Sequence, residues 1–188
     1  MNQKTQLIER LNSVNATQLE RMKLAEELHG DPESIALLIE LMAERTDEIG
    51  IRAAWVLEWI CRSDVTPILP HLEDFTTCLN NLKPDGSIRA AAKVCALLTG
   101  SQISGTVKHA ISEAPFRARV ISTCFDWLIG PFSIASKAYS MQTLFELGSN
   151  ESWVHEELKA ILQQNYSSES AGYRARARKV LNLMEKPR

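Results

Sequence analysis

The chain has 188 residues, of which 45% are hydrophobic and 23% are charged, and its formal net charge is −2. These values are ordinary for a soluble globular domain, and they give no reason to expect nucleic acid or an anionic membrane as the main partner. No apolar run approaches the roughly 18–20 residues that a membrane span needs, and the polar start MNQKTQLIERLNSVNA lacks the apolar core of a signal peptide, so we expect a cytoplasmic protein.

Apolar residues recur at helical spacing along the first half of the chain, and no segment alternates as a strand does. A first short helix contains Leu7, Ile8 and Leu11. Further helices are predicted over residues 17–29, 33–45, 47–62, 67–82 and 88–100. Asp31 is expected to cap the helix over 33–45, and Asp47 the helix over 47–62, because a short acidic side chain accepts hydrogen bonds from the first free N–H groups of a helix.

The second half of the chain continues the helical pattern after one irregular stretch. Residues 101–115 are expected to form a loop around one short helix. Helices are then predicted over residues 116–130, 132–148, 151–166 and 169–184. Asn150 is expected to cap the helix over 151–166, and Ser167 or Ser168 the last one.

A short element recurs at a fixed interval. Arg52-Ala53 returns as Arg89-Ala90 after 37 residues, and Lys137-Ala138 returns as Arg174-Ala175, also after 37. The interval from 89 to 137 is 48 residues, and the irregular stretch lies within it. Each unit is interpreted as two helices, the second of which begins with a base and an alanine. The base is expected to pair with an acid four residues earlier, as in Glu48–Arg52 and Asp85–Arg89, and the alanine to let the next helix approach. Because one helix pair cannot bury its own apolar face, successive pairs are expected to stack.

The helix-pair pattern resembles HEAT-like and armadillo-like repeats over about residues 31–186. The stretches RAAWVLEWIC, CFDWLI, KAYSMQTLFELG and YRARARKVL look like a family of short bacterial helical-repeat proteins that has often been labelled adenylosuccinate lyase. Pattern and resemblance imply an all-α fold, a right-handed α-solenoid of about four to five HEAT-like helix pairs. A single domain is expected over 1–188, with capping helices in 1–30, repeats in 31–186 and an irregular insertion near 101–115.

The lyase label itself implies a mobile loop of the type S-S-x-M-P-x-K-x-N-P. In this chain Ser167-Ser168 is followed by Glu169, and the loop is absent from the sequence. The sequence therefore supplies no residue to which lyase chemistry could be transferred.

No other motif indicates catalysis, a cofactor or a metal ion. The four histidines, His29, His71, His109 and His155, are scattered over separate segments without metal-ligand spacing. There is no glycine-rich phosphate loop and no G-x-S-x-G element. We therefore predict no catalytic residue, no cofactor-binding residue and no metal ligand. This is more typical of a protein without enzymatic activity than of an enzyme.

The four cysteines and the chain end have simple interpretations. Cys61, Cys78, Cys95 and Cys124 lie in apolar helical stretches without a C-x-x-C pair, so we expect buried, reduced thiols. Residues 171–188 carry six basic residues and one acid, Glu185. They form either an electrostatic recognition feature or, as we prefer, the solvated face of a terminal helix.

Four residues of the helix over 47–62 share one face: Arg52, Trp55, Trp59 and Arg62, at i, i+3, i+7 and i+10. They would form either a recognition patch or, as we prefer, a packing layer between helix pairs. Trp127 and Trp153 are expected in the core.

From the architecture, the sequence predicts a protein-interaction module or scaffold that uses its concave surface. Candidate contacts with a protein or peptide partner are Arg52, Trp55, Trp59, Arg62, Lys93, Lys137, Gln142 and Arg178. One alternative is a nucleic-acid-backbone reader or DNA-repair-type protein, which would need a continuous basic concave lining. The other is an enzyme under the lyase label. Partner identity and oligomeric state stay open.

Overall fold

The computed structural model describes residues 2–15, 17–100, 102–112 and 114–186. Within these residues the chain forms helices and no β-strand. The α-helices are α1 (Gln3–Ser13), α2 (Gln18–Leu28), α3 (Pro32–Glu44), α4 (Glu48–Ser63), α5 (Leu72–Cys78), α6 (Asp85–Thr99), α7 (Gly105–Ser112), α8 (Ala114–Ile129), α9 (Ile134–Leu147), α10 (Ser152–Asn165) and α11 (Ala171–Met184). Two 3-10 helices, η1 (Thr66–His71) and η2 (Leu79–Asn81), flank α5. Residues 1, 16, 101, 113, 187 and 188, which fall within the predicted caps, insertion and basic end, lie outside the described residues.

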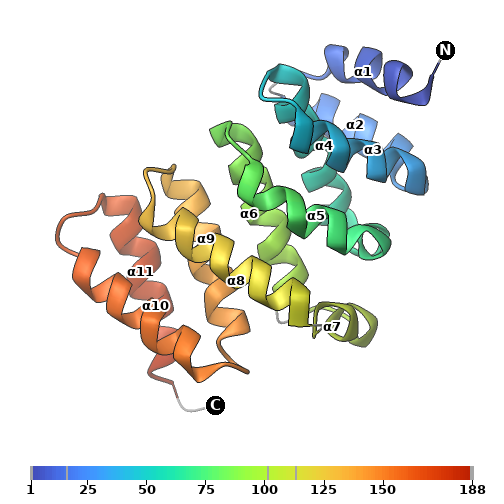
Figure 1. Cartoon of the computed structure of the whole chain (residues 1–188). Helices are drawn as coiled ribbons and strands as arrows, with labels where there is room; N and C mark the ends of the chain where they lie inside the picture. Colours follow the sequence, from blue (N-terminus) through green and yellow to red (C-terminus); the bar gives the residue numbers. More distant parts are fainter. Residues whose placement is uncertain (1, 16, 101, 113, 187–188) are drawn as a thin grey trace.

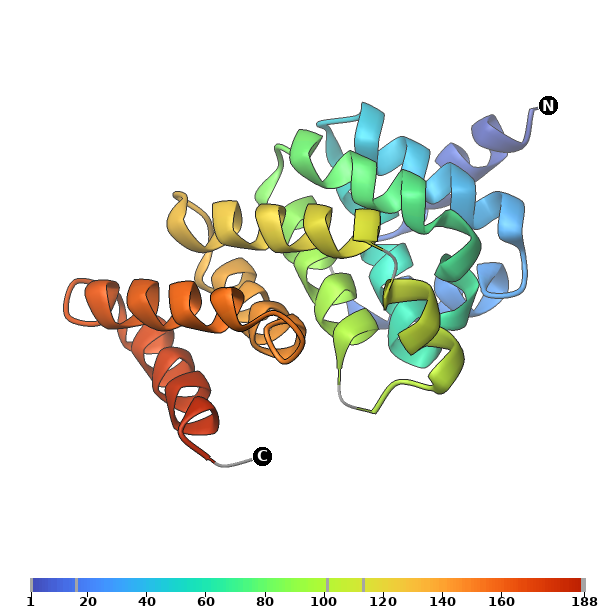
Figure 2. The ribbon, with the colours of Figure 1, turned by 60° about the horizontal axis from the view of Figure 1, so that its bottom comes forward.

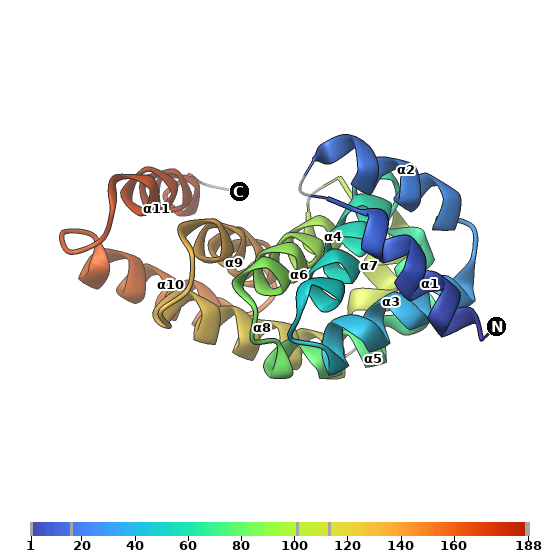
Figure 3. The ribbon, with the colours of Figure 1, turned by 90° about the horizontal axis from the view of Figure 1, so that it is seen from above.

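Most of the helices form two rows (Figure 1). The outer row consists of α3, α5, α8 and α10. The inner row consists of α2, α4, α6, α9 and α11, and each of these helices packs on the next. Figure 3 shows that the inner row curves, so that α2 and α11 stand on either side of a concave surface, the inner face. The two termini lie at opposite ends of the array (Figure 1). The predicted all-α solenoid is therefore confirmed.

The repeated alanines are buried in two neighbouring inner helices. Ala53 and Ala54 of α4 are buried, and so are Ala90 and Ala91 of α6. α4 and α6 pack side by side, and small side chains allow their backbones to approach closely. The repeated element therefore contributes buried alanines to two helices that pack on each other, and its role in that contact stays a prediction.

Helix α7 occupies the longer interval between the second and third repeat positions. It packs on α6, α8 and η1, while α6 and α9 remain direct neighbours. Figure 2 shows α7 beside the N-terminal end of α8. The extra residues therefore add a helix at the side of the array without interrupting the inner row.

The predicted caps of α3 and α4 are confirmed. The Asp31 carboxylate accepts a hydrogen bond from the N–H of Glu33 at 3.1 Å. Asp47 accepts one from the N–H of Ile49, also at 3.1 Å. These bonds satisfy N–H groups that have no acceptor inside the helix.

The predicted caps of the last two helices are wrong. Glu151 rather than Asn150 precedes α10, and its side chain makes no cap hydrogen bond. Ser170 rather than Ser167 or Ser168 caps α11. The reason is that the turn after α10 takes up both earlier serines, so α11 begins later than the pattern suggested.

The predicted helix over residues 67–82 is divided into η1, α5 and η2. Pro67 and Pro70 both lie in η1. Proline has no N–H to donate, and its ring displaces the carbonyl four residues earlier, so a regular α-helix cannot run through this stretch. The α-helical part is therefore short.

All four cysteines are buried free thiols, as predicted: Cys61, Cys78, Cys95 and Cys124. Burial raises the pKa of the Cys78 thiol to about 12, because an apolar environment disfavours the thiolate. None of the helices in the described part of the chain is both long enough and apolar enough to cross a membrane.

The two tryptophans expected in the core differ. Trp127 of α8 is 3% exposed, as predicted, but Trp153 of α10 is 53% exposed, so that prediction is wrong. The reason is that α10 packs on α9 and α11, whereas Trp153 faces α8, where it stacks on Phe125 and stays half exposed.

Candidate functional site

A recess of about 240 Å³ lies on the inner face, where four consecutive inner helices meet. It is lined by Gln18 and Arg21 of α2, Glu58, Trp59 and Arg62 of α4, Arg89 and Lys93 of α6, and Ala135 and Tyr139 of α9. We call it the inner recess. Its residues are far apart in the sequence, so the packing of the inner row creates it.

Glu58 is the one acidic residue among the described residues that line the inner recess, and it is only 7% exposed. Lys93 Nζ donates a hydrogen bond to Glu58 Oε1 at 2.7 Å, and Arg62 Nη1 lies 3.9 Å from the same oxygen. A carboxylate that has lost most of its water needs such partners. The Lys93–Glu58 pair therefore also ties α6 to α4.

Aromatic rings restrain two of the cations at the inner recess. Arg62 Cζ lies 3.9 Å from the ring centroid of Trp59, and Lys93 Nζ lies 5.8 Å from that of Tyr139. The negative face of an aromatic ring attracts a cation at such distances. A guanidinium held against a ring has less side-chain freedom to lose when it binds an acceptor.

Arg21 reaches the same region from α2. Its Cζ lies 3.6 Å from the ring centroid of Trp55. Burial lowers the pKa of the Arg21 guanidinium; the Glu58 carboxylate counteracts this, and the neighbouring positive charge of Arg89 adds to it. Arginine titrates so far above neutral pH that Arg21 remains charged.

The base at the first repeat position is used inside the fold. Arg52 Nη1 donates to the carbonyl oxygens of Leu11 at 3.3 Å and Asn12 at 2.9 Å. Its Nε lies 3.8 Å from a carboxylate oxygen of Glu48, as the predicted pair requires. Arg52 therefore fixes the end of α1 against α4.

The bases at the last two repeat positions converge on one residue. Lys137 Nζ donates to Glu169 Oε1 at 2.6 Å, and Lys137 is itself buried. Arg174 Nη1 donates to the backbone carbonyl of Glu169 at 3.0 Å. These bonds fix the turn before α11 onto α9.

Arg89, at the second repeat position, differs from the other three. Among the described residues no hydrogen bond or ion pair engages its guanidinium. The expected Asp85–Arg89 pair is not formed, because Asp85 Oδ1 instead accepts a hydrogen bond from the N–H of Ser133 at 3.2 Å. Arg89 thus presents an uncompensated positive charge to the inner recess.

The structure brings only part of the predicted contact set together. Trp59, Arg62 and Lys93 line the inner recess, whereas Trp55 lies beside it under Arg21. Arg52 and Lys137 make the internal bonds described above. Gln142 donates to Glu146 at 2.7 Å in a separate hollow near η1, and Arg178 donates to the Tyr166 hydroxyl at 3.1 Å.

Four recess residues that contribute charge or an aromatic ring were not predicted as contacts from the sequence: Arg21, Glu58, Arg89 and Tyr139. Of these, Arg89 carried a usable signal, because it occupies a repeat position. Arg21 and Tyr139 belong to α2 and α9. The position of these helices against α4 and α6 is set by packing and cannot be predicted from hydrophobic periodicity.

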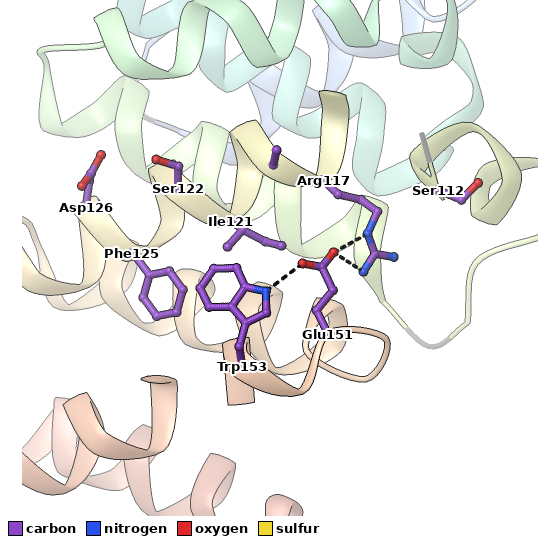
Figure 4. Close-up of a pocket in the computed structure, with 9 residues that line it drawn as sticks. Ser112, Arg117, Ile121, Ser122, Phe125, Asp126, Glu151 and Trp153 are labelled. Carbon is purple, nitrogen blue, oxygen red and sulfur yellow. Dashed lines mark hydrogen bonds and ion pairs between the residues drawn. The ribbon is translucent and has the colours of Figure 1, made fainter. Parts of the chain in front are cut away.

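A second pocket, of about 630 Å³, lies on the outer side between α8 and α10 (Figure 4). Trp153 stacks on Phe125, with ring centroids 6.0 Å apart, and donates through Nε1 to Glu151 at 3.1 Å. Arg117 forms an ion pair with Glu151 at 2.7 Å. We call this second pocket the outer pocket. Arg117 and Glu151 therefore neutralise each other, whereas the inner recess keeps the unpaired charge of Arg89.

In the described ranges, no group of three or more His, Cys, Asp or Glu side chains is arranged to hold a metal ion. His155 has a structural contact instead, since its Nε2 lies 2.7 Å from the Phe145 carbonyl oxygen and its ring stacks on Phe145 at 5.4 Å.

Comparison with known proteins points to the same repeat architecture. A family model described as HEAT repeat domain matches residues 4–184, which is nearly the whole chain. No curated protein and no solved structure gives a match.

Proposed function

This chain belongs to the HEAT repeat domain family, and from that premise we propose that it is a protein-interaction module whose inner face binds a partner protein. Stacked helical repeats form extended curved surfaces that suit this purpose. The observation that carries the proposal is the inner recess, to which four successive inner helices contribute charged and aromatic side chains.

Two properties of the inner recess support a binding role. It is open to solvent while its walls are fixed, because the Lys93–Glu58 bond and the Arg62–Trp59 contact hold side chains of α4 and α6 in place. Arginine, tyrosine and tryptophan are the residue types enriched where protein interfaces concentrate their binding free energy. Trp59, Arg62 and Lys93 are the members of the predicted contact set that we retain as contacts.

The proposal can be tested by site-specific photocrosslinking with the full chain. A photoreactive residue at Gln18, which is exposed at the rim of the inner recess, is expected to label a partner in native lysate. The same residue at Ser122, which is exposed in the outer pocket, serves as the matched control and is expected not to label that partner.

A variant that fills the inner recess gives the second part of the test. Ala135→Trp places a large side chain in the recess without removing any existing hydrogen bond, so it is expected to abolish labelling and to lower the affinity of the purified partner by about tenfold or more. Trp153→Ala, in the outer pocket, is expected to leave both unchanged. Labelling only from Ser122, or full affinity in a folded Ala135→Trp protein, would contradict the proposal.

A further inference from the structure

We propose that the inner recess binds an acidic segment of the partner, with an aspartate or glutamate carboxylate held by the Arg89 guanidinium. This inference rests on the proposed function, because it assumes that a protein is what the inner face binds. Nothing in the family assignment specifies the chemistry of that partner.

The charges of the inner recess are strongly unbalanced. Arg21, Arg62, Arg89 and Lys93 surround a single carboxylate, that of Glu58. Lys93 lies close enough to neutralise it, at 2.7 Å. The remaining positive charge stands in a concave site with low-dielectric walls, which focuses the field and favours an anion from outside.

Arg89 is the group best placed to take up that anion. Its counterparts at the other repeat positions are committed to internal acceptors: Arg52 to backbone carbonyls, and Lys137 and Arg174 to Glu169. At Arg89 the local acid is occupied elsewhere, because Asp85 accepts from Ser133. The fold therefore leaves one guanidinium fork unused at the inner recess, and a carboxylate matches that fork with two parallel hydrogen bonds.

Size and the distribution of charge favour a carboxylate segment over nucleic acid. A phosphate backbone is held by a track of free bases along the surface. Here Arg52 and Lys137, which flank the inner recess in the repeat, are engaged in internal bonds. The volume of about 240 Å³ is below the roughly 300–1,000 Å³ of pockets for drug-sized ligands. It suits one or two side chains of an extended segment better than a duplex.

The test uses the full chain and a fluorescently labelled oligoglutamate peptide, with binding followed by anisotropy. Wild-type protein is expected to bind the peptide, and added salt is expected to weaken binding because the contacts are charged. Arg89→Gln is expected to weaken binding by about tenfold, since one charge-assisted pair is lost. Arg89→Lys, which keeps the charge and loses the fork, is expected to fall between the two.

The matched control is Lys159→Gln, which removes one positive charge from an exposed position of α10. It is expected to change the affinity by less than about twofold. Because no partner holds Arg89 in the described structure, Arg89→Gln is expected to keep the wild-type thermal midpoint, which is measured alongside.

Three results would overturn the inference: no binding of oligoglutamate, equal effects of Arg89→Gln and Lys159→Gln on that binding, or tighter binding of an oligonucleotide of matched charge. The last result would assign the inner recess to nucleic acid.

The photocrosslinking experiment separates this inference from the proposed function. If oligoglutamate does not bind but Gln18 still labels a partner protein, the proposed function stands and the acidic ligand is wrong. If Gln18 labels no partner either, both proposals fail.

Discussion

Glu58 illustrates how much a single residue constrains the inner row. It follows the buried Leu57 on α4, and it is itself almost completely buried. An apolar residue there would avoid the cost of removing a charge from water. The carboxylate instead bonds Lys93 of the next helix, so the position combines a packing contact with a charge pair that fixes how α6 lies against α4.

Replacing Lys93 by methionine tests this pair. Lys93→Met leaves the Glu58 carboxylate buried with only the more distant Arg62, so we expect the free energy of unfolding to fall by about 1–3 kcal/mol, the cost of a buried acceptor that has lost its hydrogen bond. The double variant Glu58→Gln with Lys93→Met removes the charge as well and is expected to recover most of that loss. Urea unfolding of the single and double variants measures the coupling, and additive losses would contradict the assignment.

At the scale of the element, the corner between α3 and α4 leaves no room for an added side chain. Asp47 caps α4 and also forms an ion pair with Arg45. Gly50 lies in the first turn of α4, where a Cβ would lie 2.1 Å from the backbone oxygen of Arg45. Because that neighbour is backbone, it cannot move aside as a flexible side chain would.

Gly50→Ala therefore strains the α3–α4 corner. We expect it to lower the free energy of unfolding by about 1–3 kcal/mol, the usual range for overpacking. Gly30→Ala is the matched control, because no atom lies within 4 Å of a Cβ at that glycine. It is expected to be neutral or to stabilise slightly. Equal thermal midpoints for the two variants would contradict this account.

The same corner predicts a pH dependence. The hydrogen bond from Arg45, assisted by the N–H groups of Gly50 and Ile49, lowers the pKa of Asp47 to about 2. A carboxyl with a lowered pKa in the folded state contributes stability that is present above its unfolded pKa and lost as the pH falls through the folded one. We expect this contribution to disappear between about pH 4 and pH 2.

Asp47→Asn separates the charge from the cap. Asparagine still accepts the helix N–H groups, so the variant is expected to fold with a smaller loss of stability between about pH 4 and pH 2 than the wild type. Urea midpoints measured across that range check the difference. Parallel pH profiles for the two proteins would show that the Asp47 charge has no such role.

For the whole molecule, the sequence predicted the array better than the site. The recurrence of Arg52 at Arg89 required α4 and α6 to be equivalent neighbours, and short acidic caps located the starts of α3 and α4. The inner recess was harder to predict from the sequence. It brings together residues from Gln18 to Tyr139, and how closely they approach depends on the curvature of the inner row. Trp153 was misjudged for a related reason, since periodicity identifies an apolar residue but not whether a neighbouring helix covers it.

The inner recess takes its walls from four successive helices of the inner row, and this has a mechanical consequence. Any bound segment that touches both Arg21 and Tyr139 bridges α2 and α9, so it resists straightening of the array. Occupancy and bending are then linked thermodynamically, and the linkage is reciprocal. Tension that separates the two ends of the chain would lower the affinity for the bound segment. In return, the bound segment would make the array stiffer against that tension.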